Sequence, residues 1–328
     1  MEKQCWRIIA AAGWIYLLLV AVALVLPANA QEFTELTAPE NLGSPISTEF
    51  GEAGPFISKD GLSLFFNSNR PVPGSNCPGG LAGIDIYVSQ RAAVDDPWGE
   101  PVNLGPNINS CFDDQTSVLS PDEHRLYFAS NRPGGFGGID LYVSSRQERR
   151  DDFGWRPPKN LDGNVNTLGG QFGPSLFEDD VTGITILYFS SNPTGVAGTS
   201  DIYASALDVD GSFLPAVLVA ELSTPCPPTP VGCNDIFPGI RRDGLEIFLV
   251  SNRSGGLGLL DIWSSTRAST SDPWSTPVNR TVVNSTADDF RPVLSFDGRS
   301  LYFGSNRLGG FGGNDIYVST REKLPELE

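Results

Sequence analysis

The chain has 328 residues, 40% of them hydrophobic and 19% charged, and its formal net charge is −17. A chain of this length and apolar content can bury a large core. Its charge excludes nucleic acid and anionic lipid as partners, because both would repel it.

Residues 1–30 differ in character from the rest of the chain. Lys3 and Arg7 precede an apolar run from Ile8 to Leu26, and Ala28-Asn29-Ala30 ends this segment. The pattern predicts a signal peptide over 1–30, cleaved before Gln31, and therefore a periplasmic or secreted protein over 31–328 with no membrane insertion after cleavage. The alternative is an uncleaved N-terminal anchor, since the apolar run is near the length that spans a bilayer.

One sequence pattern recurs five times and organises the remainder of the chain. In its second copy it reads Ser130-Asn131-Arg132-Pro133-Gly134-Gly135 and continues to Asp140-Leu141-Tyr142. The other copies begin at Ser68, Ser191, Ser251 and Ser305. The period is about 60 residues, which fits propeller blades that have long loops.

Each copy contains four segments with strand character. A tight turn such as Asp297-Gly298 precedes an aromatic strand, Leu301-Tyr302-Phe303 in the last copy, and no helical periodicity appears. Four antiparallel strands per repeat predict an all-β protein with a single closed five-bladed β-propeller. The blades are expected at about 49–104, 111–161, 170–218, 234–278 and 288–320.

The two ends of the chain complement each other. The outer-strand pattern of Trp98-x-x-Pro101-Val102-Asn103-Leu104-Gly105 also occurs at Leu36-x-x-Pro39-Glu40-Asn41-Leu42-Gly43, where no blade precedes it. The last copy ends near Thr320 without such a strand. A closing strand within 33–42 is therefore expected to complete the fifth blade, which removes exposed strand edges.

The pattern at 120–142, Ser-Pro-Asp followed by Leu-Tyr-Phe-Ala-Ser-Asn-Arg-Pro-Gly-Gly and Asp-Leu-Tyr, resembles the WD40-like, TolB-type propeller repeat. The resemblance covers nearly all of 33–328. It implies an exported or envelope propeller of bacterial type that serves as a protein-interaction module. The chain departs from the family in its number of units, so the resemblance does not extend to a Tol–Pal-like role.

An aspartate precedes the third strand of every unit. These residues are Asp85, Asp140, Asp201, Asp261 and Asp315. Because a single site needs only some of the blades, recurrence in all five favours a structural role over a metal or substrate carboxylate. We expect each aspartate to accept hydrogen bonds from its own loop, assisted by Arg70, Arg132, Arg253 or Arg307.

A second polar position varies from blade to blade at the start of the first strand. Its members are Glu52, Asp114, Gln171, Asp235 and Asp289. In a propeller the first strand is innermost, so these side chains are expected to ring one mouth of the channel and to be the ligand-binding candidates. Four acids there could hold Ca²⁺ or, in an enzyme, act as an acid/base set made of Glu52, Asp114, Asp235 and Asp289. The alternative is a hydrated acidic ring without a ligand.

Four cysteines follow the predicted signal peptide, which itself contains Cys5. Cys226 and Cys233 bracket a short Pro-rich loop, so pairing of these two is the most local choice and leaves Cys77 for Cys111. The spacings disfavour zinc, and His124 is the only histidine. Both disulfides would brace the face that carries the predicted acidic ring, which favours that face for binding.

The leading functional hypothesis is a non-catalytic exported propeller that binds a protein, peptide or glycan at the acidic mouth. The alternative is a glycoside-hydrolase-like enzyme that uses carboxylates from the inner strands. Nucleophilic hydrolysis has little support, because His124 follows a hairpin turn on the face opposite the predicted ring.

Overall fold

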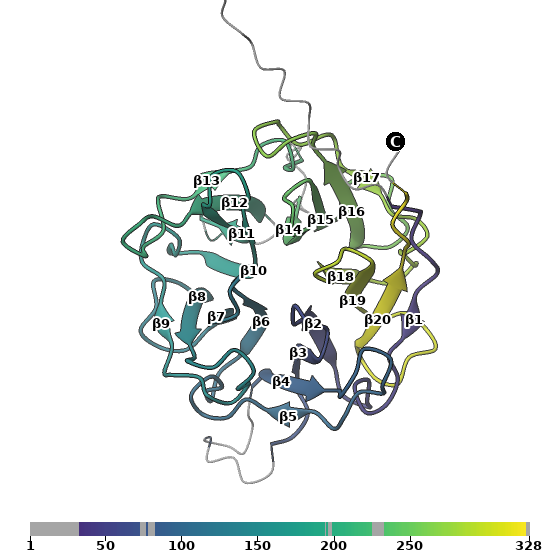
Figure 1. Ribbon diagram of the computed structural model, residues 1–328, viewed down its shortest axis with the longest axis horizontal. Coiled ribbons are helices and arrows are strands. Elements are labelled where there is room, and N and C mark those ends of the chain that lie inside the picture. The colour runs from purple at the N-terminus through teal and green to yellow at the C-terminus, as the bar shows by residue number, and fades with distance from the viewer. Residues whose placement is uncertain are drawn as a thin grey trace, which may run out of the picture.

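The computed structural model describes residues 33–72, 77, 83–193, 195, 199–224 and 233–325. These residues form twenty strands in five four-stranded sheets arranged around a central axis (Figure 1). The described part contains no helix long and apolar enough to cross a membrane. The all-β five-bladed propeller predicted from the repeat is therefore confirmed. The predicted signal peptide, residues 1–30, lies outside the described residues and stays a prediction.

Every sheet is built from strands at four distances from the axis, and all neighbours are antiparallel. The innermost strands are β2 (Glu52–Ile57), β6 (Asp114–Leu119), β10 (Gly170–Glu178), β14 (Asp235–Ile240) and β18 (Asp289–Leu294). The second strands are β3 (Ser63–Ser68), β7 (Arg125–Ser130), β11 (Thr185–Asn192), β15 (Glu246–Ser251) and β19 (Ser300–Ser305). The third strands are β4 (Asp85–Gln90), β8 (Asp140–Ser145), β12 (Asp201–Ala206), β16 (Asp261–Thr266) and β20 (Asp315–Thr320). The outer strands are β5 (Val102–Asn103), β9 (Lys159–Asn160), β13 (Val217–Leu218), β17 (Val278–Asn279) and β1 (Glu40–Asn41).

The second strand of each blade supplies much of the core. In blade 2 it reads Leu126-Tyr127-Phe128, and none of these three side chains is more than 2% exposed. Consecutive residues of a strand point to opposite faces, and here both faces are covered by neighbouring blades. That is why these strands are continuously apolar, without the alternation of a sheet that has one face in water.

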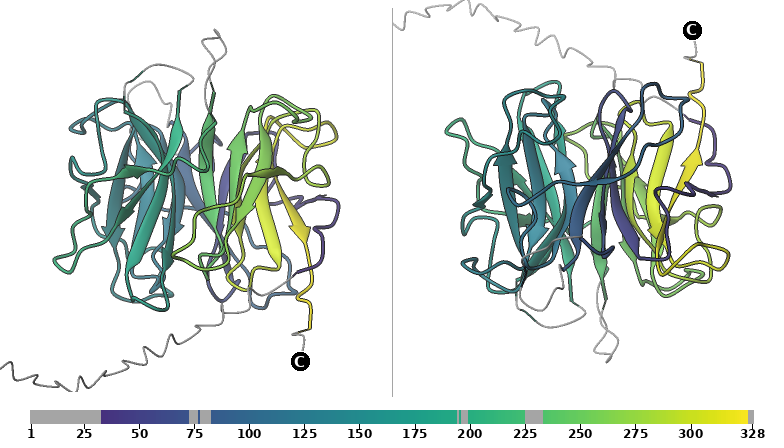
Figure 2. Two further views of the ribbon diagram at one scale, coloured as in Figure 1. Left: turned by 90° about the horizontal axis from the view of Figure 1, so that it is seen from above. Right: turned by 90° about the horizontal axis from the view of Figure 1, so that it is seen from below.

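Side views show the two ends of the propeller (Figure 2). We call one end the hairpin face; it is formed by the turns that join first to second strands, at 58–62, 120–124, 179–184, 241–245 and 295–299. The opposite end, the loop face, carries the glycine-rich loops between second and third strands and the connections between blades. Because each innermost strand runs from the loop face to the hairpin face, its first residue lies near the former and its last near the latter.

The N-terminal segment closes the ring. β1 pairs with β20, with Glu40 opposite Val318 and Asn41 opposite Tyr317, and an isolated bridge joins Phe33 to Lys323. The fifth blade is thus completed by the N-terminal strand as predicted, although regular pairing within 33–42 is limited to two residues.

Replacing Phe33 by Ala is expected to lower the free energy of unfolding by about 1–2 kcal/mol. The Phe33 ring covers the guanidinium of Arg321 at 4.0 Å and lies 5.3 Å from that of Arg241, so it fastens the N-terminal segment over blades 4 and 5. Denaturant unfolding measures the effect, with Glu35→Ala as the control because Glu35 is exposed. Equal stability of the Phe33→Ala variant and the wild type would show that this contact does not hold the closure.

Candidate functional site

The five residues predicted to ring the channel mouth are fully buried. The side chains of Glu52, Asp114, Gln171, Asp235 and Asp289 are all 0% exposed. Each lies at the start of an innermost strand, as predicted: four are the first residue of the strand, and Gln171 is the second residue of β10. Their side chains contact groups of their own blade and of its connecting loop. The structure therefore corrects the expectation that they line an open mouth, and it does not bring them together into one site.

Four of these residues are carboxylates held by an arginine. In blade 1, Arg70 Nη2 lies 3.1 Å from Glu52 Oε1, and Thr48 donates its N–H to Glu52 Oε2 at 2.8 Å and its hydroxyl to Oε1 at 2.7 Å. The same arrangement joins Arg132 to Asp114, Arg253 to Asp235 and Arg307 to Asp289. Charge-assisted bonds of this kind satisfy a buried carboxylate. We call these four ion pairs the arginine clamps.

Blade 3 shows that the clamp is a matched pair. It has Pro193 where the other blades have arginine, and it has the neutral Gln171 where they have an acid. Gln171 Oε1 accepts the N–H of Thr167 at 2.8 Å, and its Nε2 donates to Thr167 Oγ1 and Ser191 Oγ. A buried acid without its cation would be costly, so loss of the arginine accompanies loss of the charge.

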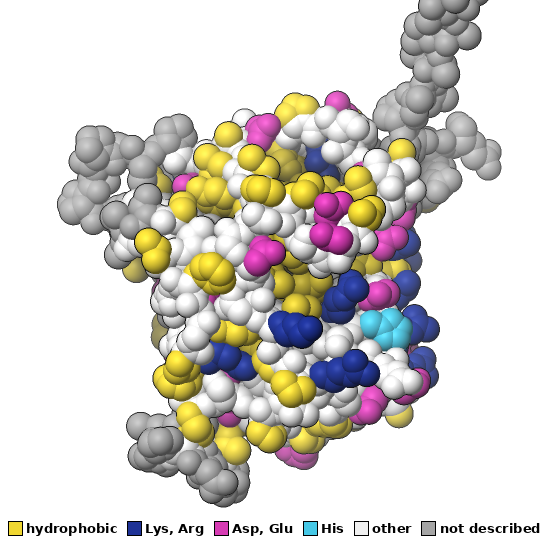
Figure 3. Space-filling model, turned by 90° about the vertical axis from the view of Figure 1, so that its left-hand side faces the viewer, with side chains coloured by type: hydrophobic (Ala, Val, Ile, Leu, Met, Phe, Trp, Pro, Cys, Tyr) yellow, Lys and Arg dark blue, Asp and Glu magenta, His cyan; other side chains and the backbone are white. Residues whose placement is uncertain are grey.

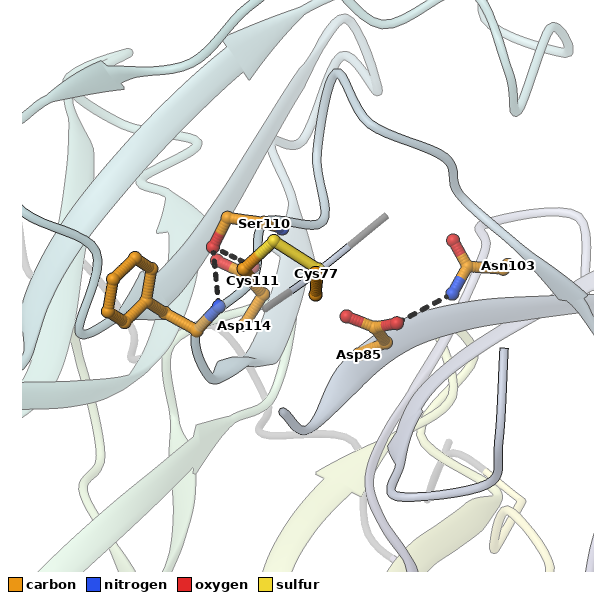
Figure 4. Close-up of a disulfide and its surroundings, with 7 residues drawn as sticks. Cys77, Asp85, Asn103, Ser110, Cys111 and Asp114 are labelled. Carbon is orange, nitrogen blue, oxygen red and sulfur yellow. Dashed lines mark hydrogen bonds between the residues drawn. A yellow bond between two sulfur atoms is a disulfide. The ribbon is translucent and has the colours of Figure 1, made fainter. Parts of the chain in front are cut away.

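Three of the repeat aspartates, Asp140, Asp261 and Asp315, accept backbone N–H groups of their own loop, as expected. Asp85 is bonded by a side chain of its own outer strand. Asp140 Oδ2 accepts the N–H of Phe136 at 2.6 Å, and Asp85 Oδ2 accepts the amide of Asn103 at 2.9 Å. The expected assistance from the motif arginines is wrong, because those arginines bond the first-strand acids. Figure 4 shows Asp85 with the Asn103 side chain on one side and with the Cys77–Cys111 disulfide and Asp114 of the next blade on the other.

Burial raises the pKa of several repeat aspartates. The pKa of Asp85 rises to about 6, chiefly because burial disfavours its charged form, with the negative charges of Asp114 and Asp113 adding to the effect. Burial also raises the pKa of Asp201, Asp261 and Asp315. The folded protein therefore binds protons more tightly at these positions than the unfolded chain does.

Stability is accordingly expected to fall as the pH rises from about 4 through about 6. A carboxyl with a raised pKa contributes stability that is fully present below its unfolded pKa and is lost as the pH passes its folded pKa. Thermal unfolding at pH 5 and pH 7.5 measures the change, for which we expect a decrease of a few degrees. Asp85→Asn should weaken this dependence, and a wild-type midpoint that rises over the same range would contradict the assignment.

A disulfide lies on the loop face. Cys77 is bonded to Cys111, whose Cα atom is 5.2 Å away, and this confirms the predicted pair (Figure 4). Cys111 directly follows Ser110, which donates its hydroxyl to Asp114 at 2.7 Å. Cys233 is also disulfide-bonded, whereas Cys226, its predicted partner, lies outside the described residues. The Cys77–Cys111 bond therefore anchors the loop that completes the clamp of blade 2.

An accessible cavity of about 200 Å³ opens on the hairpin face, at the end of the channel opposite the predicted site. All five innermost strands or their turns line it. Its carboxylates are Glu123 in the turn of blade 2, Glu178 at the end of β10, and Asp180 in the turn of blade 3. Glu178 and Asp180 are exposed and Glu123 is half-buried, so all three can meet a ligand from solvent.

Aromatic and cationic groups complete the wall of this cavity. The ring of Phe296 lies between Lys59 Nζ at 4.4 Å and the Arg242 guanidinium at 4.6 Å, and Phe56 and Phe177 face the cavity further in. Such rings offer flat apolar surfaces, and both cations make cation–π contacts with the Phe296 ring.

Glu123 has an unusual backbone conformation. Its φ is +59°, in the left-handed region, where the corresponding turn residues Gly61, Gly244 and Gly298 are glycines. A non-glycine residue in such a conformation costs about 1–3 kcal/mol, and such strain clusters at functional sites. The carboxylate is held across the blade boundary, because Glu123 Oε1 accepts the N–H of Lys59 at 2.7 Å.

The hairpin turns carry a ring of side chains that differ in kind from blade to blade and that line the cavity. At the second turn position the five blades have Lys59, Pro121, Asp180, Arg242 and Phe296, and all five side chains line the cavity. A single asymmetric site requires positions at which the blades differ in kind. This signal was present in the sequence, but it was missed because the turns were interpreted only as hairpin geometry.

The single histidine lies on the outer wall of the propeller. Figure 3 shows it among Lys and Arg side chains on that wall, and His124 Nδ1 lies 3.3 Å from the Arg146 carbonyl oxygen. His124 thus lies beside the residue that follows the third strand of its own blade, and the expectation that it forms no Ser–His pair in the channel stays a prediction.

No group of three or more His, Cys, Asp or Glu side chains with the geometry of a metal site occurs among the described residues. The Ca²⁺ considered for the first-strand ring remains an untested prediction. Each of the four carboxylates in this ring is already paired with an arginine, which fits the arginine clamps better than a metal site.

No protein-family model and no curated protein matches the sequence. Solved structures do match in fold. A thermostable family-43 glycoside hydrolase superposes with a TM-score of 0.55 at 13% identity, covering 87% of this chain and 93% of that one. An α-L-arabinofuranosidase from Lactobacillus brevis gives 0.57 at 13% identity, with 86% and 93% covered. A family-43 β-xylosidase/α-arabinofuranosidase from a compost microbial metagenome, in complex with xylotriose, gives 0.52 at 13% identity, with 91% and 100% covered.

At this level of identity the matches show the fold, a five-bladed propeller, and they bring two corrections. The matched structures are glycoside hydrolase propellers and not TolB-type repeats, so only the propeller part of the proposed resemblance stands. The expectation of a non-catalytic interaction module is wrong, because the matched propellers are enzymes. The prediction that this chain binds a protein or peptide partner is therefore not supported either.

Proposed function

We propose that this protein is a carbohydrate-active enzyme, a glycoside hydrolase that acts in the cavity on the hairpin face. The observation that carries the proposal is this cavity on the propeller axis, which presents accessible carboxylates from two neighbouring blades beside aromatic side chains. The fold shared with family-43 hydrolases and arabinofuranosidases supports it.

Hydrolysis of a glycosidic bond requires two carboxyl groups with different roles. One protonates the leaving oxygen, and the other activates water or attacks the sugar. Glu178 and Glu123 are the candidates for these roles, since both line the cavity and neither belongs to an arginine clamp. Asp180 is less suited, because Arg242 lies 4.0 Å from it. These residues replace the set first expected from the sequence, whose members are buried and ion-paired.

The size of the cavity limits what enters it. At about 200 Å³ it is smaller than the roughly 300–1,000 Å³ of pockets for drug-sized ligands. The fit is to one sugar unit at a chain end, with Phe56 or Phe296 against its apolar face. The disulfide between Cys77 and Cys111 supports an exported location, as the N-terminal segment predicts, where polysaccharides are the substrates at hand.

The test is a screen of the wild-type protein against aryl glycosides and plant and bacterial polysaccharides, with release of reducing ends as the readout. Activity that is lost in both Glu178→Gln and Glu123→Gln supports the proposal. Absence of activity on every glycan, with folded protein verified by its unfolding transition, would reject it.

A further inference from the structure

Arg291 is an isolated cation inside the channel. It is the third residue of β18, at the point where every innermost strand bulges, and its φ is +56°. The equivalent residues of the other four blades are uncharged: Gly54, Thr116, Gly173 and Phe237. Four blades form the same bulge without a charge, so the fold does not require the arginine.

The Arg291 side chain crosses between blades. Its Nη1 donates to Asn67 Oδ1 of blade 1 at 2.8 Å, and its Nη2 donates to Gln115 Oε1 of blade 2 at 2.8 Å. Its guanidinium lies 4.8 Å from the centre of the Phe237 ring of blade 4. A Cβ atom on Gly54 would come within 2.3 Å of Asn67 Oδ1 and 3.2 Å of Nη1, so the glycine leaves room for the contact between these two groups.

The charge of Arg291 is not neutralised by a carboxylate. None of the ion pairs of the described residues includes it, and its Nε is buried without a hydrogen-bond partner. Burial lowers its pKa to about 10, which leaves it protonated at neutral pH. Amide oxygens compensate a buried cation only in part, so an anion placed beside it would be stabilised.

Arg291 lies one level deeper along the axis than the proposed active-site cavity. It lines a separate space of about 30 Å³ that is bounded by the bulges of all five blades. Phe56, Val118 and Val293 line both spaces, so they are adjacent. Since one water molecule occupies about 10–15 Å³ of a cavity measured in this way, the space has room for about two oxygen-sized atoms, the number in a carboxylate.

We propose that Arg291 is a specificity residue that binds the carboxylate of an acidic sugar, so that the cavity on the hairpin face takes uronic acid units of a glycan. This inference rests on the proposed function for its glycan, but the anion site itself is defined by Arg291. A guanidinium donates in a planar fork that matches a carboxylate. The remaining N–H groups of Arg291 supply these donors in the small space next to the cavity.

Arg291→Gly is the matched variant, because blades 1 and 3 already have Gly-Pro where blade 5 has Arg291-Pro292. It is expected to fold, since glycine adopts the positive φ without strain. Arg291→Gln is measured beside it and keeps an amide in place of the cation. Arg299→Ala removes an arginine that is about half exposed at the surface and serves as the control.

The experiment is isothermal titration calorimetry with glucuronate, glucose and glucose 6-sulfate. The wild type and Arg299→Ala should bind glucuronate at least roughly tenfold more tightly than glucose, and Arg291→Gly and Arg291→Gln should lose this preference. Equal binding of glucuronate and glucose by the wild type overturns the inference, and so does tighter binding of the sulfate ester. Cleavage of neutral glycans without a preference for uronate rejects this inference and leaves the hydrolase proposal standing. Binding of uronate that depends on Arg291, without cleavage of any glycan, supports this inference and rejects the hydrolase proposal.

Discussion

Glu178→Gln is expected to lower kcat for glycan hydrolysis by roughly 10²–10⁴-fold, the range for loss of a positioned general acid or base. Glu178 ends an innermost strand, its side chain is exposed, and it lines the cavity on the hairpin face. The amide preserves the shape of the side chain and removes its ability to transfer a proton. The unfolding midpoint should therefore stay within a degree or two of the wild type. Steady-state kinetics on the best substrate of the screen measures the change.

Glu123→Gly provides a second, more selective test. Glycine occupies this turn position in three other blades, so the change relieves the strain of the positive φ at Glu123. It also removes the bond from Glu123 to the Lys59 N–H. We expect a variant of near wild-type stability that has lost at least roughly a hundredfold in kcat. Wild-type kcat in both this variant and Glu178→Gln would place catalysis elsewhere on the propeller.

Asp289→Ala is expected to lower the free energy of unfolding by about 3–5 kcal/mol, the typical result of removing one partner of a buried ion pair. Asp289 is 0% exposed, it is bonded to Arg307, and it also accepts the N–H and the hydroxyl of Ser285. Its loss leaves the Arg307 charge beside Phe303 and Tyr317 without an anion. Denaturant unfolding monitored by tryptophan fluorescence measures the effect.

Blade 3 supplies the control for this prediction. The double variant Asp289→Gln with Arg307→Ala copies the uncharged state of Gln171 and Pro193, and it should recover a substantial part of the stability lost in Asp289→Ala. Additive losses in the double variant would show that the two residues do not act as a pair. Hydrolysis, if detected, should persist in every variant that remains folded, because the clamp is remote from the cavity.

The architecture could be predicted from the sequence because it depends on local and repeated signals. Five copies of the motif set the number of blades, and the pattern Pro39-Glu40-Asn41 located the closing strand near its observed position. The pairing of Cys77 with Cys111 followed from the local pairing expected for the other two cysteines, Cys226 and Cys233. Each of these inferences requires only the order of strands and the connections between them.

The site could not be predicted in the same way, because burial depends on three-dimensional contacts. The sequence correctly placed Asp114 at the start of an innermost strand. Its partner Arg132, however, lies eighteen residues away in the sequence, and we had expected this arginine to assist Asp140. The absence of both charges in blade 3, at Gln171 and Pro193, was the available sign of a pair. The position of Arg291 inside the channel depends on a β-bulge that cannot be identified from the sequence.

A crystal structure of Glu178→Gln, soaked with the substrate or with an oligosaccharide product found in the activity screen, tests the proposed active site directly. We expect a sugar unit in the cavity on the hairpin face, in contact with Phe56 or Phe296 and within hydrogen-bond distance of Glu123 and of the glutamine side chain at position 178. A sugar bound on the loop face instead, beside the Cys77–Cys111 disulfide and the first-strand acids, would contradict it.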